Sequence, residues 1–295
     1  MNSPAIARTP VAALLSDFSE LAKARLSLLV LLTTLVGFLL GWRGPMNFTL
    51  LAATLVGTAM CAAGASTLNQ WWERDLDARM KRTRDRPLPS GRVHPGDALL
   101  LGIFLSIFGV LILLLFANIR AGFLAFSTIV IYVAVYTPMK RMTSLNTLVG
   151  AVPGALPPLI GWVAARGTYN LEGCLLFALL WFWQMPHFLA IAWLYREDYK
   201  SAGFAMLTNE DPRGLVTSGQ ALLYALCLVP VTLMPVLAGF NAVWFFFAAL
   251  LLGGAYAWSS LRFLLVRDRP RARRLFMASI LYLPAILVCL VASRL

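Results

Sequence analysis

Nine long stretches of this chain contain no Asp, Glu, Lys or Arg residue. They cover residues 26–42, 48–68, 98–116, 121–136, 147–165, 173–195, 216–239, 242–261 and 275–293. Each is close to the ~20 residues that a helix needs to cross a lipid bilayer. Because backbone N–H and C=O groups in lipid must find partners within the protein, such segments are expected to be helices. The pattern predicts an all-α integral membrane protein with nine transmembrane helices.

The composition supports the same class. Charged residues make up 13% of the chain and hydrophobic residues 60%, whereas a soluble domain carries about 25% charged residues. The longest segment between two apolar runs is 69–97, which leaves no room for a separate soluble domain. All four cysteines lie within apolar runs and none forms a C-x-x-C pair. They are interpreted as small core residues, not as disulfides or metal ligands.

Basic residues gather on one side of the predicted topology. The N-terminal segment and the connections after the second, fourth, sixth and eighth spans hold 21 of the 25 Lys and Arg residues. The positive-inside rule makes this side cytoplasmic, with the N-terminus inside and the C-terminus outside. Every acid except Glu172 shares this side, which indicates a cytoplasmic active site. Residues 1–24 contain Asp17 and Glu20 and few serines. This argues against a cleaved targeting peptide and favours a bacterial inner membrane.

The net charge of +12 raises the question of nucleic-acid binding. The bases are spread over connections that flank the predicted spans, so attraction to anionic lipid headgroups is the favoured interpretation. The lipid bilayer is therefore an expected partner, and no nucleic acid is.

The most densely charged stretch extends from Asn69 to Pro89. It holds four acids and six bases, which are Glu73, Asp75, Asp77 and Asp85 with Arg74, Arg79, Lys81, Arg82, Arg84 and Arg86. If the second helix continues past the bilayer, Asn69, Glu73 and Asp77 recur every four residues and share one face. Oxygen ligands at this spacing suit Mg²⁺, which keeps positions for water and phosphate. The alternative interpretation is a solvated helix end with ion pairs between neighbouring turns.

Six bases are candidates for binding a diphosphate and stabilising it as a leaving group. They are Lys81, Arg82 and Arg86 in 69–97, Lys140 and Arg141 after the fourth span, and Lys200 in 195–213. Some of them would instead bind lipid headgroups, and the sequence does not separate the two groups. The connections 69–97 and 195–213 are expected to face each other as active-site loops.

His187 lies within the sixth apolar run, in the sequence Q-M-P-H-F. An ionisable side chain within a membrane is costly and marks a candidate functional site. The alternative is a hydrogen-bonded residue of the helix bundle, with Gln184 one turn earlier as its candidate partner.

Several of these segments together match a known family. N-Q-W-W-E-R-D-L-D-A-R-M-K-R-T-R-D-R-P-L-P-S-G resembles the first Asp-rich motif of the UbiA-type intramembrane prenyltransferases. The chain is similar to that nine-helix family from about residue 20 to residue 293. The similarity is greatest to the heme-using branch, through Y-T-P-M-K-R, G-A-V-P-G-A-L-P-P-L-I-G-W, Q-M-P-H-F and Y-R-E-D-Y-K-S-A-G-F-A-M-L.

The resemblance implies one domain over residues 1–295, with nine helices around a central cavity. The implied reaction is Mg²⁺-dependent transfer of a farnesyl group from farnesyl diphosphate to a vinyl group of heme b, giving heme O and diphosphate. Contact with a heme-A synthase or with terminal oxidase assembly is a further expectation.

The resemblance also assigns roles to residues. Asn69, Glu73 and Asp77 occupy catalytic Mg²⁺–diphosphate positions, and Glu73 stands where many relatives have Asp. In the second loop, relatives that use aromatic acceptors carry D-x-x-x-D, whereas this chain has tyrosines at that spacing with Asp198 between them. Asp198 is the catalytic residue expected from this loop, and the ligands of a second metal stay open. His187 is the candidate for contact with the porphyrin or its iron.

Two other functions are weighed against this one. A prenyltransferase for another acceptor, such as 4-hydroxybenzoate, would be expected to carry D-x-x-x-D in 195–213, which is absent. A transporter of an anionic substrate would be expected to place ionisable groups near the middle of the membrane. Here the charges cluster at one face and only His187 lies within a span.

Overall fold

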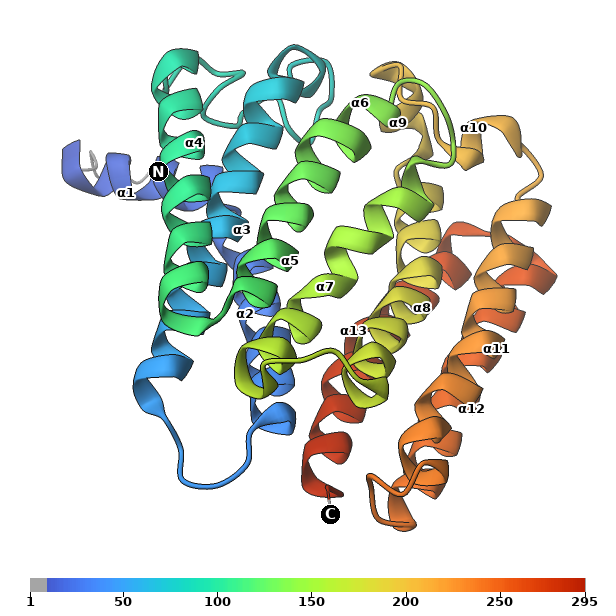
Figure 1. Cartoon of the computed structure of the whole chain (residues 1–295). Helices are drawn as coiled ribbons and strands as arrows, with labels where there is room; N and C mark the ends of the chain where they lie inside the picture. Colours follow the sequence, from blue (N-terminus) through green and yellow to red (C-terminus); the bar gives the residue numbers. More distant parts are fainter. Residues whose placement is uncertain (1–9, 295) are drawn as a thin grey trace, which may run out of the picture.

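The computed structural model describes residues 10–294, and all of its regular elements are helices (Figure 1). The α-helices are α1 Pro10–Leu21, α2 Ala24–Gly41, α3 Phe48–Asp77, α4 Pro95–Ile112, α5 Ile119–Val130, α6 Thr137–Met139, α7 Asn146–Arg166, α8 Leu171–Leu194, α9 Arg196–Ser201, α10 Leu207–Glu210, α11 Leu215–Leu237, α12 Trp244–Val266 and α13 Arg269–Ala292. Two π-helical segments, η1 Leu113–Ala117 and η2 Ile131–Tyr136, continue α4 and α5.

Within residues 10–294, nine helical segments are long and apolar enough to cross a membrane. Each overlaps one of the nine uncharged runs over most of that run's length, so the prediction of nine transmembrane helices is confirmed. The second span, α3, runs on beyond its apolar part to Asp77, as the spacing of the polar residues requires. Expectations about residues 1–9 lie outside the described part of the chain.

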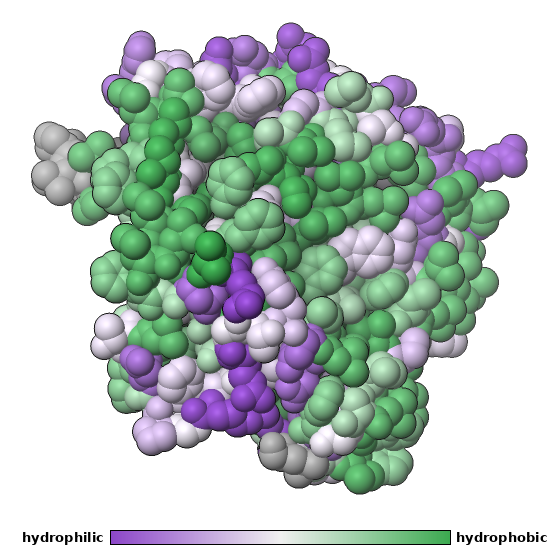
Figure 2. Space-filling model, viewed as in Figure 1, coloured by the Kyte–Doolittle hydropathy of each residue, from purple (hydrophilic) through white to green (hydrophobic). Residues whose placement is uncertain are grey.

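The connections α3–α4, α6–α7, α8–α11 and α12–α13 share one end of the bundle, here named the cation-rich end. In Figure 1 this end is at the top, where α6, α9 and α10 lie, and the C-terminus is at the bottom. Apolar side chains cover the upper middle of the face shown in Figure 2, and hydrophilic residues gather along its top edge and over its lower part. A surface of this kind suits a bilayer around the middle of the bundle.

The helix α7 is the most deeply buried span of the described chain. It packs against α2 so closely that a Cβ at Gly161 would lie 1.9 Å from the carbonyl oxygen of Thr34. A Cβ at Gly37 would lie equally close, 1.9 Å, to the carbonyl oxygen of Pro158. Small residues allow such an approach in membranes, where apolar burial alone gives little attraction between helices. This contact fixes α2, and therefore the residues at its start, against the centre of the bundle.

Gly161→Ala tests the α2–α7 contact. The added methyl group would press on backbone atoms that cannot rotate away, so we expect destabilisation by about 1–3 kcal/mol or more. Thermal unfolding in detergent, followed by circular dichroism, measures the effect. Gly254→Ala is the matched control, because a Cβ there meets no atom within 4 Å. An unchanged unfolding temperature for Gly161→Ala would contradict the close approach.

Candidate active site

The last turns of α3 place three polar side chains side by side at the cation-rich end. Asn69, Glu73 and Asp77 are 1%, 4% and 1% exposed, whereas Asp75 on the same helix is exposed. The four-residue spacing therefore puts them on one inward face, as the sequence predicts. Their burial excludes the alternative of a solvated helix end. Buried carboxylates are costly without partners, so Glu73 and Asp77 are expected to be paired with cations.

Glu73 is paired with Lys140, which follows α6. The Lys140 Nζ atom donates to Oε2 of Glu73 at 3.0 Å and lies 2.9 Å from Oε1. It also lies 4.7 Å from the ring centre of Tyr136 and 5.7 Å from that of Phe204. Burial acts to lower the pKa of Lys140, but Tyr136 and Glu73 outweigh it, so the pKa lies above its ordinary value. Lys140 therefore pairs with Glu73 as its cation.

Asp77 is paired with Arg86, which the α3–α4 connection brings back onto the end of α3. The guanidinium Nη1 donates to Oδ2 of Asp77 at 2.6 Å. The hydroxyl of Thr83, in the same connection, donates to the backbone oxygen of Asp77 at 2.8 Å. Charge-assisted hydrogen bonds of this kind are short and strong, so the connection is held tightly over the site.

Asn69 is held by Lys23, in the turn before α2, and by Thr137 of α6. Its Oδ1 atom accepts from Lys23 Nζ at 2.9 Å, and its Nδ2 atom donates to Thr137 Oγ1 at 3.0 Å. The hydroxyl of Tyr132 lies 3.4 Å from both Asn69 Oδ1 and Lys23 Nζ. The amide is therefore oriented with its oxygen toward the cation.

The sequence analysis missed Lys23 as a site residue. It lies just before α2 in the left-handed backbone conformation, with φ 47°, which costs free energy for any residue with a side chain. Burial lowers the pKa of Lys23 to about 7, and the neighbouring cations Arg86 and Lys140 act in the same direction. An anion bound beside this side chain would favour its charged form. The one signal in the sequence is a lysine three residues before the first uncharged run, which begins at residue 26.

The two loops expected to form the site do pack together. Met80 of 69–97 is buried against Ala202 and Phe204 of 195–213. The backbone N–H of Ala205 donates to the carbonyl oxygen of Lys140 at 2.6 Å. The second loop therefore positions the lysine that neutralises Glu73.

The structure separates the predicted bases. Arg86 and Lys140 reach the buried acids, whereas Lys81, Arg82, Arg141 and Lys200 are exposed. Arg82 lies over the rings of Tyr195 and Tyr199, at 5.3 Å and 6.0 Å from their centres. Asp198 is half-buried, and its carboxylate forms no ion pair among the described residues. None of these five side chains forms an ion pair with Glu73 or Asp77 in the described part of the chain.

His187 lies on α8 among aromatic side chains. Its ring is 5.3 Å from that of Trp183 and 5.1 Å from that of Phe276. Its Nδ1 atom is 2.7 Å from Ser279 Oγ on α13. The expectation that Gln184 pairs with His187 is wrong, because the Gln184 amide donates to a backbone oxygen of α7. Although Gln184 and His187 are only three residues apart on α8, their side chains contact different helices, α7 and α13.

The donor set fits Mg²⁺ when a ligand supplies further oxygens. Among residues 10–294, no group of three or more His, Cys, Asp or Glu side chains is arranged to hold a metal. The cluster instead offers two carboxylates and the amide of Asn69, which suits a hard cation that also takes phosphate oxygens and water. The buried Oε1 atom of Glu73 forms no hydrogen bond with the described residues, although the Lys140 ammonium is close. That oxygen is 2.9 Å from the Lys140 Nζ atom, so a metal bound there would take the place of this cation.

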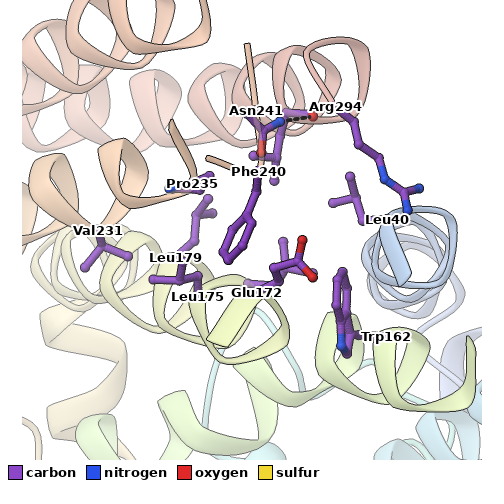
Figure 3. Close-up of a pocket in the computed structure, with 12 residues that line it drawn as sticks. Leu40, Trp162, Glu172, Leu175, Leu179, Val231, Pro235, Phe240, Asn241 and Arg294 are labelled. Carbon is purple, nitrogen blue, oxygen red and sulfur yellow. Dashed lines mark hydrogen bonds between the residues drawn. The ribbon is translucent and has the colours of Figure 1, made fainter. Parts of the chain in front are cut away.

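The pocket in Figure 3 lies at the opposite end of the bundle. Apolar side chains from α2, α7, α8, α11 and α13 form most of its wall, and Glu172 and Arg294 are among its polar members. Arg43 and Glu172 are 4.0 Å apart there. The pocket is separate from the buried cluster at the cation-rich end.

A multi-pass membrane protein with a buried carboxylate–cation cluster at one end is the class that this fold and site define. A model of the UbiA prenyltransferase family matches residues 30–281. The chain belongs to the UbiA prenyltransferase family.

Two bacterial relatives are named protoheme IX farnesyltransferase. The one from Solibacter usitatus (strain Ellin6076) is 42% identical over 94% of this chain and 98% of its own length. The one from Opitutus terrae (strain DSM 11246 / JCM 15787 / PB90-1) is 42% identical over 95% of each chain.

Solved structures share the fold. A digeranylgeranylglyceryl phosphate synthase superimposes with a TM-score of 0.81 at 15% identity, covering 95% of this chain and 98% of that one. A UbiA homologue from Archaeoglobus fulgidus bound to GPP and Mg²⁺ gives 0.65 at 15% identity, covering 93% and 99%.

Lys140→Met tests the buried pair with Glu73. Removing the cation leaves a buried carboxylate without its partner, so we expect a loss of about 3 kcal/mol in the free energy of unfolding. The double variant Glu73→Gln/Lys140→Met should recover part of that loss, since it removes both charges. Denaturant unfolding in detergent measures the free energy of unfolding of the wild type and of both variants.

The control for this pair is Arg84→Met. Arg84 and its partner Asp85 have side chains that are 63% and 86% exposed, so the change should stay within about 0.5 kcal/mol. Equal losses in the free energy of unfolding for Arg84→Met and Lys140→Met would contradict the expectation that the buried pair contributes more to stability than the exposed one.

Proposed function

We propose that this protein transfers a farnesyl group from farnesyl diphosphate to a vinyl group of heme b, giving heme O and diphosphate. Membership of the UbiA prenyltransferase family and the relatives named protoheme IX farnesyltransferase support the reaction. The observation that carries the proposal is the buried row Asn69, Glu73 and Asp77, with a cation of the chain on each member.

Asn69, Glu73 and Asp77 would hold Mg²⁺. When bound there, the metal supplies positive charge that stabilises the departing diphosphate. A buried site strengthens this effect, because charges interact more strongly away from water.

Lys23, Arg86 and Lys140 are the cations placed to bind the diphosphate directly. Each already contacts one of the three proposed metal ligands. A metal on those ligands would compete for the oxygens, and the cationic side chains would then pair with phosphate oxygens. Lys81, Arg82, Arg141 and Lys200 would attract the diphosphate from the rim, and Asp198 would balance their charge.

The chemistry is electrophilic alkylation. The bond between farnesyl C1 and the diphosphate oxygen breaks, and the electrons leave with the diphosphate. The vinyl carbon of heme b attacks C1, and water then adds to the resulting cation and loses a proton. The rings of Tyr132 and Tyr136, stacked with centres 5.6 Å apart beside the cluster, present π-faces that favour a developing allylic cation. The surrounding apolar helices limit the access of water to that cation before attack.

His187 is proposed to contact the porphyrin or its iron. The hydroxyl of Ser279 donates its own proton to the carbonyl oxygen of Phe276 at 2.6 Å. The contact with His187 must then use an Nδ1–H donor, which leaves the lone pair on Nε2. A neutral imidazole with a free Nε2 is the usual form of a metal-ligating histidine.

The setting belongs to the same proposal. The chain would form one domain over residues 1–295 in a bacterial inner membrane, with the cation-rich end and the N-terminus on the cytoplasmic side. The nine helices would surround a central cavity for farnesyl diphosphate and heme b. A heme-A synthase or a terminal oxidase under assembly would be the protein that receives the product.

Asp77→Ala and Glu73→Ala test the metal and diphosphate roles. We expect each to lower the rate of heme O formation by at least about 100-fold, because the leaving group loses its stabilisation. Purified protein is incubated with heme b, farnesyl diphosphate and Mg²⁺, and heme O is detected by mass spectrometry. Chelation of Mg²⁺ should stop the wild-type reaction. Asp75→Ala on the exposed face of α3 is the control and should keep full activity. Retained activity in Asp77→Ala would remove that residue from the site.

His187→Ala tests the heme contact separately. We expect weaker heme binding, measured by titration of the Soret band, with unchanged affinity for farnesyl diphosphate. Ser279→Ala, which removes the partner of Nδ1, should weaken heme binding less. Wild-type heme affinity in His187→Ala would discard this role and leave the metal site untouched.

A further inference from the structure

The short turn between α12 and α13 is surrounded by arginines. Six of them lie between positions 262 and 274, and Asp268 is the one acid among them. That acid is already engaged, because its carboxylate caps α13 through the N–H of Arg271 at 2.8 Å and pairs with the guanidinium of Arg271 at 2.6 Å. The remaining positive charge at this turn therefore has no neutralising acid on its own segment.

Three of these arginines lie close together in the first turns of α13. Arg269, Arg273 and Arg274 are exposed, and their side chains form no ion pair or hydrogen bond with residues 10–294. Arg269 lies one turn before Arg273, and Arg273 and Arg274 precede Met277 by four and three residues, so all three border the stripe of α13 that runs through Met277. Long cationic side chains gathered in this way repel one another unless an anion lies between them.

The same face continues as an apolar groove. A groove of about 660 Å³ is lined by the three arginines, with Met277 and Leu281 on the membrane side. Met277 is 48% exposed and Leu281 is 69% exposed. At 1.5 Å per residue, Arg273 and Leu281 are ~12 Å apart along the helix axis. The groove is therefore cationic at one end and apolar at the other.

The groove faces away from the interior of the bundle. The opposite face of α13 carries Ala272, Leu275 and Ser279, which are all 0% exposed. Ser279 is the partner of His187, so the groove lies on the back of the helix that positions this histidine. A ligand in the groove would lie outside the bundle, remote from the row that begins at Asn69.

We propose that this groove binds one anionic phospholipid from the leaflet at the cation-rich end. Its phosphate would lie among Arg269, Arg273 and Arg274, whose planar guanidinium groups match phosphate oxygens. One acyl chain would cover Met277 and Leu281. A phospholipid fits because cationic and apolar side chains follow each other along ~12 Å of one exposed helix face, which is enough for a phosphate and the first part of an acyl chain. This site goes beyond the proposed reaction and does not depend on it.

The test is lipid binding to the delipidated full chain in detergent, followed by native mass spectrometry. The probes are phosphatidylglycerol and phosphatidylcholine with identical acyl chains. We expect the wild type to prefer phosphatidylglycerol by about tenfold, since each arginine near a membrane surface adds attraction for anionic lipid. The triple variant Arg269→Gln/Arg273→Gln/Arg274→Gln should lose this preference.

A matched control removes the same charge elsewhere. Arg79, Arg84 and Arg213 are exposed at the cation-rich end, and Arg79→Gln/Arg84→Gln/Arg213→Gln should keep the preference. Equal losses in the two triple variants would show diffuse attraction and overturn the proposal. So would a wild type without preference, or a groove variant that retains it.

Met277→Trp tests the tail of the groove with every charge in place. A bulkier side chain at this exposed position would block the acyl chain, so phosphatidylglycerol binding should fall by about tenfold while the protein stays folded. Unchanged binding would mean that no lipid is seated there. Farnesyl diphosphate is titrated as a further probe. Arginine-dependent binding of that compound, without binding of phosphatidylglycerol, would assign the groove to the substrate instead and overturn the proposal.

Discussion

Two buried ion pairs at the end of α3 determine how the cation-rich end is assembled. Glu73 and Asp77 are almost completely removed from solvent, and such carboxylates are tolerated only with a partner of opposite charge. Lys140 and Arg86 supply those partners from two different connections. Phe204, from a third connection, covers the Lys140 ammonium. Neutralising two acids therefore brings three loops together over one helix end.

The packing of the transmembrane helices supports this arrangement of the loops. Gly37 and Gly161 allow the second half of α2 to pack closely against α7, and the hydrogen bond from Lys23 to Asn69 holds the start of α2 beside α3. Lys23 at that start adopts a left-handed conformation and directs its ammonium onto Asn69. Strain of this kind persists where surrounding contacts determine it, and such positions are common at functional sites. The close contact of α2 with α7 and the strained backbone of Lys23 therefore both help to hold α2 in the position that the site requires.

The nine spans and the shared face of the three site residues on α3 could be predicted from the sequence. Uncharged runs give the nine spans because lipid leaves the backbone few alternatives to a helix. The four-residue spacing gives the shared face of Asn69, Glu73 and Asp77. Their partners were not predictable in the same way, because Lys23 is separated from Asn69 by 46 residues and Lys140 from Glu73 by 67. Such pairs depend on how helices pack, which composition and spacing do not encode.

The charge balance of the cluster explains why metal and diphosphate would bind together. Three cations, Lys23, Arg86 and Lys140, surround the two carboxylates of Glu73 and Asp77. Mg²⁺ alone would add charge to a buried cluster that already has an excess cation. Burial lowers the pKa of Lys23, and the neighbouring cations Arg86 and Lys140 lower it further. Diphosphate alone would bring several negative charges against one surplus positive charge. Bound together they nearly cancel, so each raises the affinity for the other by the same factor. A site of this composition favours the metal–diphosphate complex over either component.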